Sequence, residues 1–225
     1  MNKFLFLILI LSVSIASFSQ KKQGRISYDI NVSSDDPQTA AYISGMEGSI
    51  LELYFGDDKI RSEMFLGDFM TTVSIMHKGN DSTLTLLDGM MGKIAMKSTL
   101  DDLDDEQRLA FTERRVDLIE GETKEIMGYK CKKAIITTPD EKEAIIWYTS
   151  EIVPDYRSGQ YLFEEIEGVP LYIDSFWGNM KTEYVAFEYK KKLKKPEKLF
   201  DMEIPKGYTR RTMEEMNQMR RGGQR

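Results

Sequence analysis

The sequence has one cysteine, Cys131, and one histidine, His77, among its 225 residues. One cysteine cannot close a disulfide within the chain, so we expect the core alone to hold the fold together. A Ser-His-Asp or Cys-His centre would have to use His77, and a zinc site needs more nitrogen and sulfur ligands than these two residues supply. We therefore expect no catalytic residue, no metal site and no cofactor; a hydrolase would have to rely on carboxylates alone.

Both residues have a simpler structural explanation. His77 falls at the end of a predicted strand, where a partly buried histidine needs no special role. Cys131 lies between Lys130 and Lys132, which point to the opposite face of a strand, so a buried, inert thiol is favoured over a reactive one. Replacing Cys131 with serine or His77 with glutamine is expected to change stability at most.

Beyond its first residues, the chain lacks an apolar run long enough to cross a bilayer. Residues 4–15 are apolar or small, follow Lys3 and precede Ser17 and Ser19, which suit the −3 and −1 positions of a cleavage site. Residues 1–19 are therefore predicted to be a signal peptide, with the mature protein periplasmic or secreted. No cysteine follows this site to carry a lipid, and no transmembrane segment is expected.

Acidic side chains outnumber basic ones by 37 to 31, giving a net charge of −6. This balance argues against nucleic acid as a partner. A lysine run at 190–195 leaves two interpretations open: binding of phosphate head groups, or a solvated strand end. An acidic run at 101–106 lacks the ligand spacing and glycine of an EF-hand, and acids in a first helical turn are stabilising.

Alternation of apolar and polar residues runs from residue 25 to 98 and indicates half-buried strands. Short turn sequences at 56–58, 78–81 and 88–89 favour hairpins between consecutive strands. Further strands are expected at 115–119, 131–138, 143–150, 169–175 and 181–190. The predicted fold is mainly β (α+β), one large antiparallel meander sheet with a covered face and short helices; the family resemblance described below implies that this sheet is an open antiparallel half-barrel wrapped around the helices.

Helices interrupt this pattern in three places. Asp36 is a good N-cap for a helix at 37–44, and Thr99 with Asp102 resembles a capping box for a helix at 101–112. Both are expected on the concave side of the sheet. A third helix is expected at 212–221. We predict one domain over 20–208, followed by a short helix and a frayed basic tail over 209–225.

Several motifs resemble a known family. They are GYKCKKA at 128–134, IWYTSEI at 146–152, GVPL at 168–171, and Phe200 followed by IPKGY at 204–208. In this order they resemble secreted Gram-negative proteins of domain-of-unknown-function family 4412, related to GLPGLI proteins, although GVPL departs from the GLPGLI motif. The resemblance covers most of residues 24–208. It implies a LolA/LolB-like half-barrel with an apolar cavity, and it implies no catalytic residue.

The leading functional hypothesis is non-enzymatic binding of an acyl or other lipid-like ligand in a half-barrel cavity. The alternative is an envelope interaction module whose partner is another protein, bound through a sheet edge or the basic tail. Seven methionines between residues 46 and 96 suit either an irregular core or an adaptable apolar surface. The residues expected to share one face and line the cavity are Ile60, Met64, Val73, Ile75, Leu84, Leu86, Ile94 and Met96.

Overall fold

The computed structural model describes residues 21–177 and 180–222; the predicted signal peptide, 1–19, lies outside them. The strands are β1 (Gly24–Ser33), β2 (Ile50–Gly56), β3 (Lys59–Leu66), β4 (Met70–His77), β5 (Thr83–Gly89), β6 (Gly92–Ser98), β7 (Arg115–Ile126), β8 (Tyr129–Thr137), β9 (Glu143–Thr149), β10 (Val169–Trp177), β11 (Met180–Lys190) and β12 (Thr209–Arg210). All the strands expected from the sequence are present.

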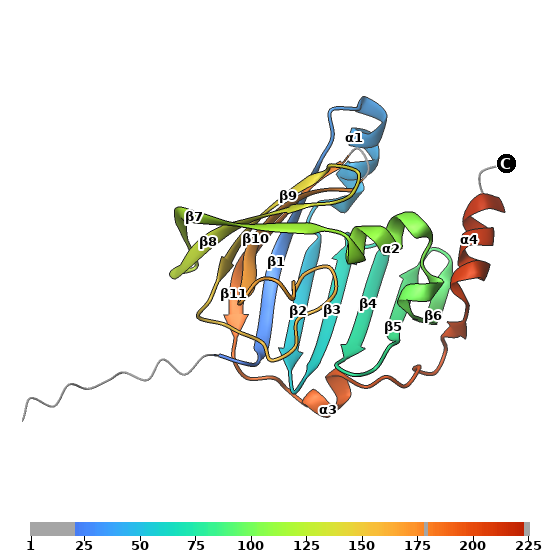
Figure 1. Ribbon diagram of the computed structural model, residues 1–225. Helices are drawn as coiled ribbons and strands as arrows, with labels where there is room; N and C mark the ends of the chain where they lie inside the picture. The colour runs from blue at the N-terminus through green and yellow to red at the C-terminus, as the bar shows by residue number, and fades with distance from the viewer. Residues whose placement is uncertain (1–20, 178–179, 223–225) are drawn as a thin grey trace, which may run out of the picture.

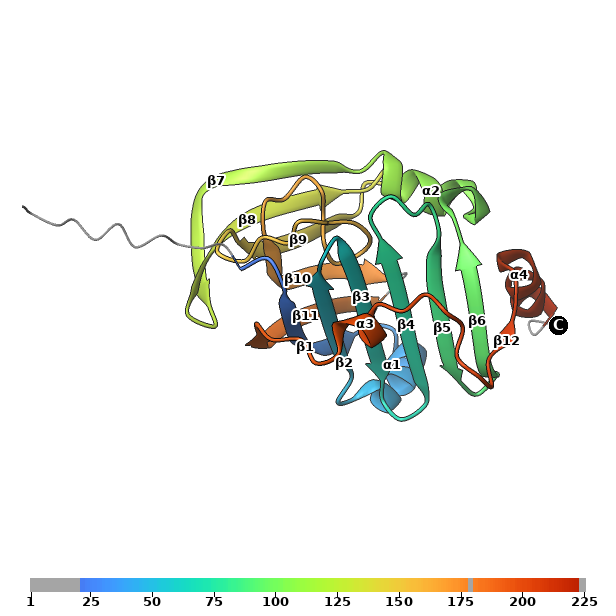
Figure 2. The ribbon, with the colours of Figure 1, turned by 90° about the horizontal axis from the view of Figure 1, so that it is seen from below.

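These strands form a single sheet in the order β12-β6-β5-β4-β3-β2-β1-β11-β10-β9-β8-β7. β1–β6 form one meander and β7–β11 a second, and the pairing of β1 with β11 joins the two. Every pairing is antiparallel except that of β12 with β6. The sheet curves strongly and stays open between its edge strands, β7 and β12 (Figure 2), so the predicted open antiparallel half-barrel is confirmed.

Two-residue hairpins connect some of the strands. Asp57 and Asp58, between β2 and β3, have φ angles of 50° and 57°, and Met127 and Gly128, between β7 and β8, have φ angles of 55° and 77°. Two consecutive residues with positive φ match the right-handed twist of the strands they join. These turns keep sequence neighbours paired over most of the sheet.

The helices are α1 (Pro37–Ile43), α2 (Asp105–Thr112), α3 (Pro196–Leu199) and α4 (Met213–Gly222), with short 3-10 turns η1 (Ser44–Met46) and η2 (Leu100–Asp102). The predicted caps are confirmed. The Thr39 amide donates to Asp36 Oδ2 at 2.9 Å. Thr99 and Asp102 form the capping box of η2, after which the chain turns into α2.

A connection without regular structure, rather than the helices, fills the concave side of the sheet. Residues 150–168, called the inner connection below, join β9 to β10 and bury Ile152, Leu162, Phe163 and Ile166 against the strands. α1 extends beyond the upper end of β1 (Figure 1), and among the described residues neither α1 nor α2 contributes to the four buried clusters. The expectation that these helices cover the concave face is wrong, because α1 has only seven residues and lies beyond the end of β1, and α2 is mostly polar.

The end of the chain covers both faces near β6. Residues 200–208 cross the convex face, where Met202, Ile204 and Tyr208 pack on a buried cluster of β4–β6. The chain then pairs with β6 as β12, and α4 places Met216 against the other face of β6. The packing therefore continues past residue 208, the predicted end of the domain.

Candidate functional site

Strand register divides the eight predicted ligand-lining residues between the two faces of the sheet. Residues directly opposite each other in an antiparallel pair share a face. Ile60 lies opposite Met76, whereas Ile75 lies opposite Arg61. Continuing this register through β5 and β6 puts Ile60, Met64, Ile94 and Met96 on the concave face, and Val73, Ile75, Leu84 and Leu86 on the convex face.

The prediction that these residues share one face is therefore wrong. Alternation shows which residues of one strand lie on the same side of the sheet. It does not show whether the apolar sides of two neighbouring strands lie on the same face of the sheet. Here the buried apolar side of β4 and β5 is the convex one, because the C-terminal segment covers it. Seven of the eight residues are buried, and Met64 alone among them is half-buried.

The concave face carries three half-buried methionines, of which Met64 lies near Tyr161 and Met76 near Gly159 of the inner connection. Met64 on β3 and Met70 and Met76 on β4 pack against the main core without being part of it; we call them the methionine face. The Tyr161 hydroxyl of the inner connection lies 3.9 Å from Met64 Sδ, and the Tyr161 ring meets that of Tyr184 edge to face at 5.4 Å. Flexible thioethers beside aromatic rings form an apolar surface that can change shape.

The inner connection buries apolar side chains toward its two ends, and charged groups attach it at its rim. Arg114 donates from Nε and Nη2 to the two carboxylate oxygens of Glu165, both at 3.1 Å. Lys22 pairs with Asp155 at 2.7 Å on the surface. The charged contacts are partly or fully solvated, so the buried apolar side chains supply most of the energy that holds the connection in place.

The attachment through Glu165 predicts a dependence on pH. Burial alone would raise the pKa of Glu165, but the hydrogen bonds and charge of Arg114 outweigh it and leave the pKa below its ordinary value. A carboxyl whose pKa is lower in the folded state stabilises that state above the pKa of the unfolded chain, and the contribution disappears as the group is protonated. We expect Glu165→Gln to be less stable than wild type at neutral pH, with the difference vanishing below about pH 4 in urea unfolding experiments. A difference that persists in acid would contradict this assignment.

His77 and Cys131 occupy structural positions. His77 Nε2 lies 2.6 Å from the Phe200 carbonyl oxygen and so attaches the C-terminal segment to the end of β4. Cys131 is fully buried in the main core, and burial raises the pKa of its thiol to about 11. A protonated, inaccessible thiol is a poor nucleophile.

Cys131 should therefore resist thiol reagents in the folded protein. At pH 8 we expect a chromogenic disulfide reagent to label Cys131 only as fast as the protein opens, and to label it at once in denaturant. The measurement is the rate of thiolate release with and without urea. Rapid labelling of the native protein would show that the thiol is accessible and would reopen the possibility of a reactive cysteine.

Two hollows lie away from the methionine face. One of about 580 Å³ is lined by Ala95, Lys97, Met202, Glu203, Ile204, Arg210, Arg211, Thr212 and Glu215. Another of about 350 Å³ is lined by Gly45, Glu47, Gly48, Gly67, Asp68 and Phe69. None of the eight predicted residues lines either hollow, and the sequence pattern marks neither of them, because their walls come from turns and from the C-terminal segment.

The described residues form no cluster of metal ligands and no helix that could span a membrane. Within residues 21–177 and 180–222, no three His, Cys, Asp or Glu side chains gather in a way that could hold a metal ion. Asp102 of the acidic run accepts hydrogen bonds from the backbone and side chain of Thr99, which lower its pKa. No helix in the described part of the chain is long and apolar enough to span a membrane.

Comparison with solved structures gives distant likenesses, among them one to a lipoprotein. The crystal structure of the lipoprotein LppX from Mycobacterium tuberculosis is similar over 77% of this chain and 90% of LppX, with 8% sequence identity and a TM-score of 0.37. No family model matches the chain, and no curated protein matches it. The function of this chain is therefore argued from its own residues and geometry.

Proposed function

We propose that the protein binds an apolar, chain-shaped ligand on its concave face and carries out no reaction on it. The observation that carries this proposal is the methionine face, three half-buried thioether side chains of which Met64 and Met76 lie against the irregular inner connection. The neighbours of these methionines on the concave face of β3 and β4 are Ser62, Thr72 and Ser74, which carry no charge, and each buried methylene of an acyl chain contributes roughly 0.8 kcal/mol.

The ligand enters by displacing part of the inner connection. Residues 150–168 form no strand or helix, and their backbone pairs with another segment through the single bridge of Ile152 with Lys21, so moving the part beyond this bridge leaves the ladders of the sheet intact. Leu162 and Phe163 already occupy the concave face with apolar side chains, which an acyl chain can replace with a similar apolar surface. The charged contacts at Glu165 and Asp155 lie at the rim and leave the middle free to move.

Export belongs to the same proposal. We propose that residues 1–19 direct the chain out of the cytoplasm, to the periplasm or the medium, and that it is a relative of family 4412. The signal-like sequence at the N-terminus and the ordered motifs between residues 128 and 208 support this. A lipid-like molecule of the cell envelope is then the class of ligand expected.

A fluorescent fatty acid tests the proposal directly. The chain from Lys21 onward contains every described strand and helix, and it should bind the probe and unfold at a higher temperature with the probe present. Met64→Glu should weaken binding about tenfold or more, because a carboxylate against an apolar ligand costs more than about 1.4 kcal/mol. Met90 is 94% exposed in a turn, so Met90→Glu is the matched control and should bind like wild type.

The outcomes separate clearly. Equal binding by the Met64 and Met90 variants would mean that the probe sits elsewhere, and absence of binding to wild type would remove the proposal. Mass spectrometry of lipids extracted from the protein purified from its own cells should then also find no specific lipid.

The second candidate is a protein interaction module. β7 ends the sheet, and over its 12 residues it pairs on one side only within the described part of the chain. Leu118 on this edge is 53% exposed. An added strand from an envelope protein could bind there, although the charged residues along β7 are of the kind that discourage edge pairing. Absence of probe binding, together with protection of β7 amides from hydrogen exchange by an envelope protein fraction, would favour this candidate.

A further inference from the structure

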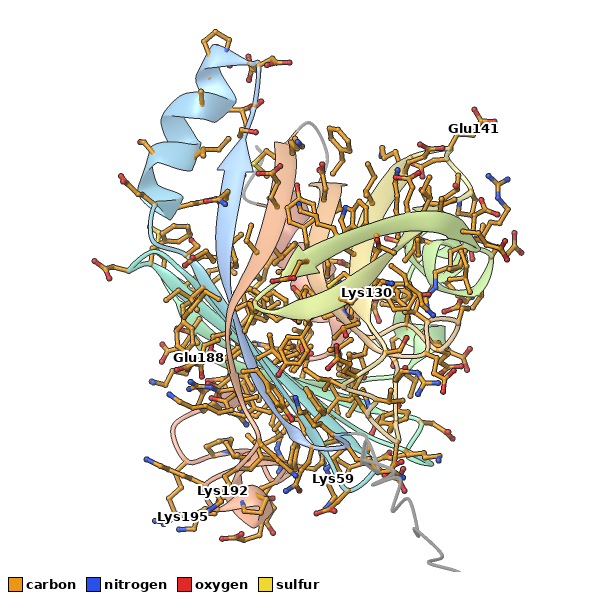
Figure 3. All side chains as sticks on the ribbon, turned by 90° about the vertical axis from the view of Figure 1, so that its left-hand side faces the viewer. Lys59, Lys130, Glu141, Glu188, Lys192 and Lys195 are labelled. Carbon is orange, nitrogen blue, oxygen red and sulfur yellow. The ribbon has the colours of Figure 1, made fainter. Side chains whose placement is uncertain are left out.

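A dense group of lysines lies at one end of the sheet. Residues 190–198, called the basic tip below, contain six lysines and one acid, Glu197, in a chain whose net charge is −6. The lysines are Lys190, Lys191, Lys192, Lys194, Lys195 and Lys198. Figure 3 shows Lys192 and Lys195 at the lower end of the molecule, with Lys59 of the β2–β3 hairpin at the same end.

The charge of the basic tip is largely uncompensated. Lys190 pairs with Glu188 at 2.9 Å, and among the described residues no other lysine of the tip makes an ion pair. All six side chains are exposed. At the same end of the sheet, Asp58 is already engaged by Lys78 at 3.4 Å. The tip therefore presents a local positive field on an otherwise acidic protein.

The tip is fixed in place rather than hanging as a free tail. Leu193 is half-buried, and Phe200, just beyond α3, is 3% exposed. The Leu199 carbonyl accepts a hydrogen bond from Arg61 Nη1 at 3.0 Å, and the amides of Lys198 and Leu199 both donate to the Lys195 carbonyl. These contacts hold both ends of a short turn, so the lysines between them are displayed together.

We propose that the basic tip docks the protein onto an anionic lipid surface. Clusters of four to eight basic residues bind anionic membranes, with roughly 1 kcal/mol from each lysine near the surface. Nucleic acid fits less well, because the tip has no aromatic side chain to stack on a base and no arginine to grip a phosphate with two hydrogen bonds. Lysine acts as a point charge, which suits dispersed lipid head groups. This docking does not depend on the apolar-ligand proposal, since it needs no bound ligand.

Vesicle binding tests the proposal. The chain from Lys21 onward avoids the apolar stretch at 4–15, which would insert into lipid by itself. We expect it to sediment with vesicles of phosphatidylcholine containing phosphatidylglycerol, but not with phosphatidylcholine alone. Binding should disappear near 1 M salt, where the Debye length falls to about 3 Å.

Matched triple variants show which lysines are responsible. Lys191, Lys192 and Lys194 to glutamine should weaken vesicle binding roughly 100-fold, given the contribution expected from each lysine. The control changes Lys97, Lys130 and Lys132, which are exposed and make no ion pair within the described residues. It alters net charge equally and should retain nearly full binding. Melting temperatures of both variants should stay close to that of wild type.

Three results would overturn the proposal. Equal losses in the two triple variants would mean that net charge, and not the tip, controls binding. Equal affinity for phosphatidylcholine vesicles would exclude an electrostatic cause. Affinity for duplex DNA as high as for anionic vesicles, lost in the tip variant, would assign the tip to nucleic acid instead.

Discussion

Gly168→Ala is expected to lower the free energy of unfolding by about 3–5 kcal/mol. This loss is the sum of the backbone strain at the new alanine and the cost of shifting the packed atoms around its Cβ. Gly168 has a φ of +153°, and a Cβ added there would lie 2.1 Å from the Thr149 carbonyl oxygen and 2.8 Å from its carbon. Both atoms belong to the backbone of β9, so neither can swing aside. Urea unfolding followed by circular dichroism measures the loss.

Gly128→Ala is the matched control. Gly128 also has a positive φ, +77°, but an added Cβ there meets nothing within 4 Å. Only the strain of the left-handed conformation remains, at about 1–2 kcal/mol. Equal losses in the two variants would show that the close approach of Gly168 to β9 contributes nothing.

The position of Gly168 gives this prediction its structural meaning. The residue closes the inner connection, and its amide donates to the Ile166 carbonyl at 2.9 Å immediately before β10 begins. Close contact with Thr149 brings the two ends of the connection together at the point where β9 and β10 start to pair. Without this close contact, the inner connection would have to enter β10 at a different angle.

Local signals predict most of the sheet. Alternation marks each strand because one face of each is buried, and the turn between β2 and β3 follows from two aspartates that tolerate positive φ. The N-cap at Asp36 and the capping box at Thr99 depend only on neighbours in sequence, and both form as expected. The antiparallel meander follows from these elements and from the order of the hairpins, whereas its closure toward a half-barrel was expected from the family resemblance.

The contents of the concave face could not be predicted in the same way. The inner connection packs through Ile152, Leu162 and Ile166, whose spacing fits neither a strand nor a helix. Its place is decided by contacts between segments far apart in the sequence, such as Arg114 with Glu165. Periodicity carries no information about such contacts.

The division of the candidate site between two faces has a related cause. Alternation in β4 and β5 is genuine, but the apolar side of these strands faces the convex surface, where Met202 and Ile204 cover it. In the covering segment Phe200, Met202 and Ile204 alternate with Asp201 and Glu203, but this pattern does not show which strands or which face the segment covers. Met64 and Ile75 therefore lie on opposite faces of the sheet, although both belong to strands with the same alternation of apolar and polar residues.

Ile75→Asp tests this division. Ile75 is 1% exposed beneath the C-terminal segment, so a carboxylate there would be buried without a partner and should destabilise the protein by about 3–5 kcal/mol. The segment should loosen first, and limited trypsin digestion should cut faster after Lys206 and Arg210 than in wild type. Both residues are exposed, so access depends on how closely the backbone is held.

Binding of the fatty-acid probe completes this prediction. Because Ile75 points away from the concave face, the affinity of the folded fraction of Ile75→Asp should equal that of wild type, in contrast to the loss expected for Met64→Glu. If the aspartate variant does not fold, Ile75→Ala removes the same convex contact without adding charge and can be measured in its place.

A loss of affinity in the folded Ile75 variant as large as that of Met64→Glu would mean that the ligand contacts the convex face, and the concave site would have to be abandoned. Retained affinity with faster cleavage would instead show that the C-terminal segment closes the outer core while the methionine face alone receives the ligand.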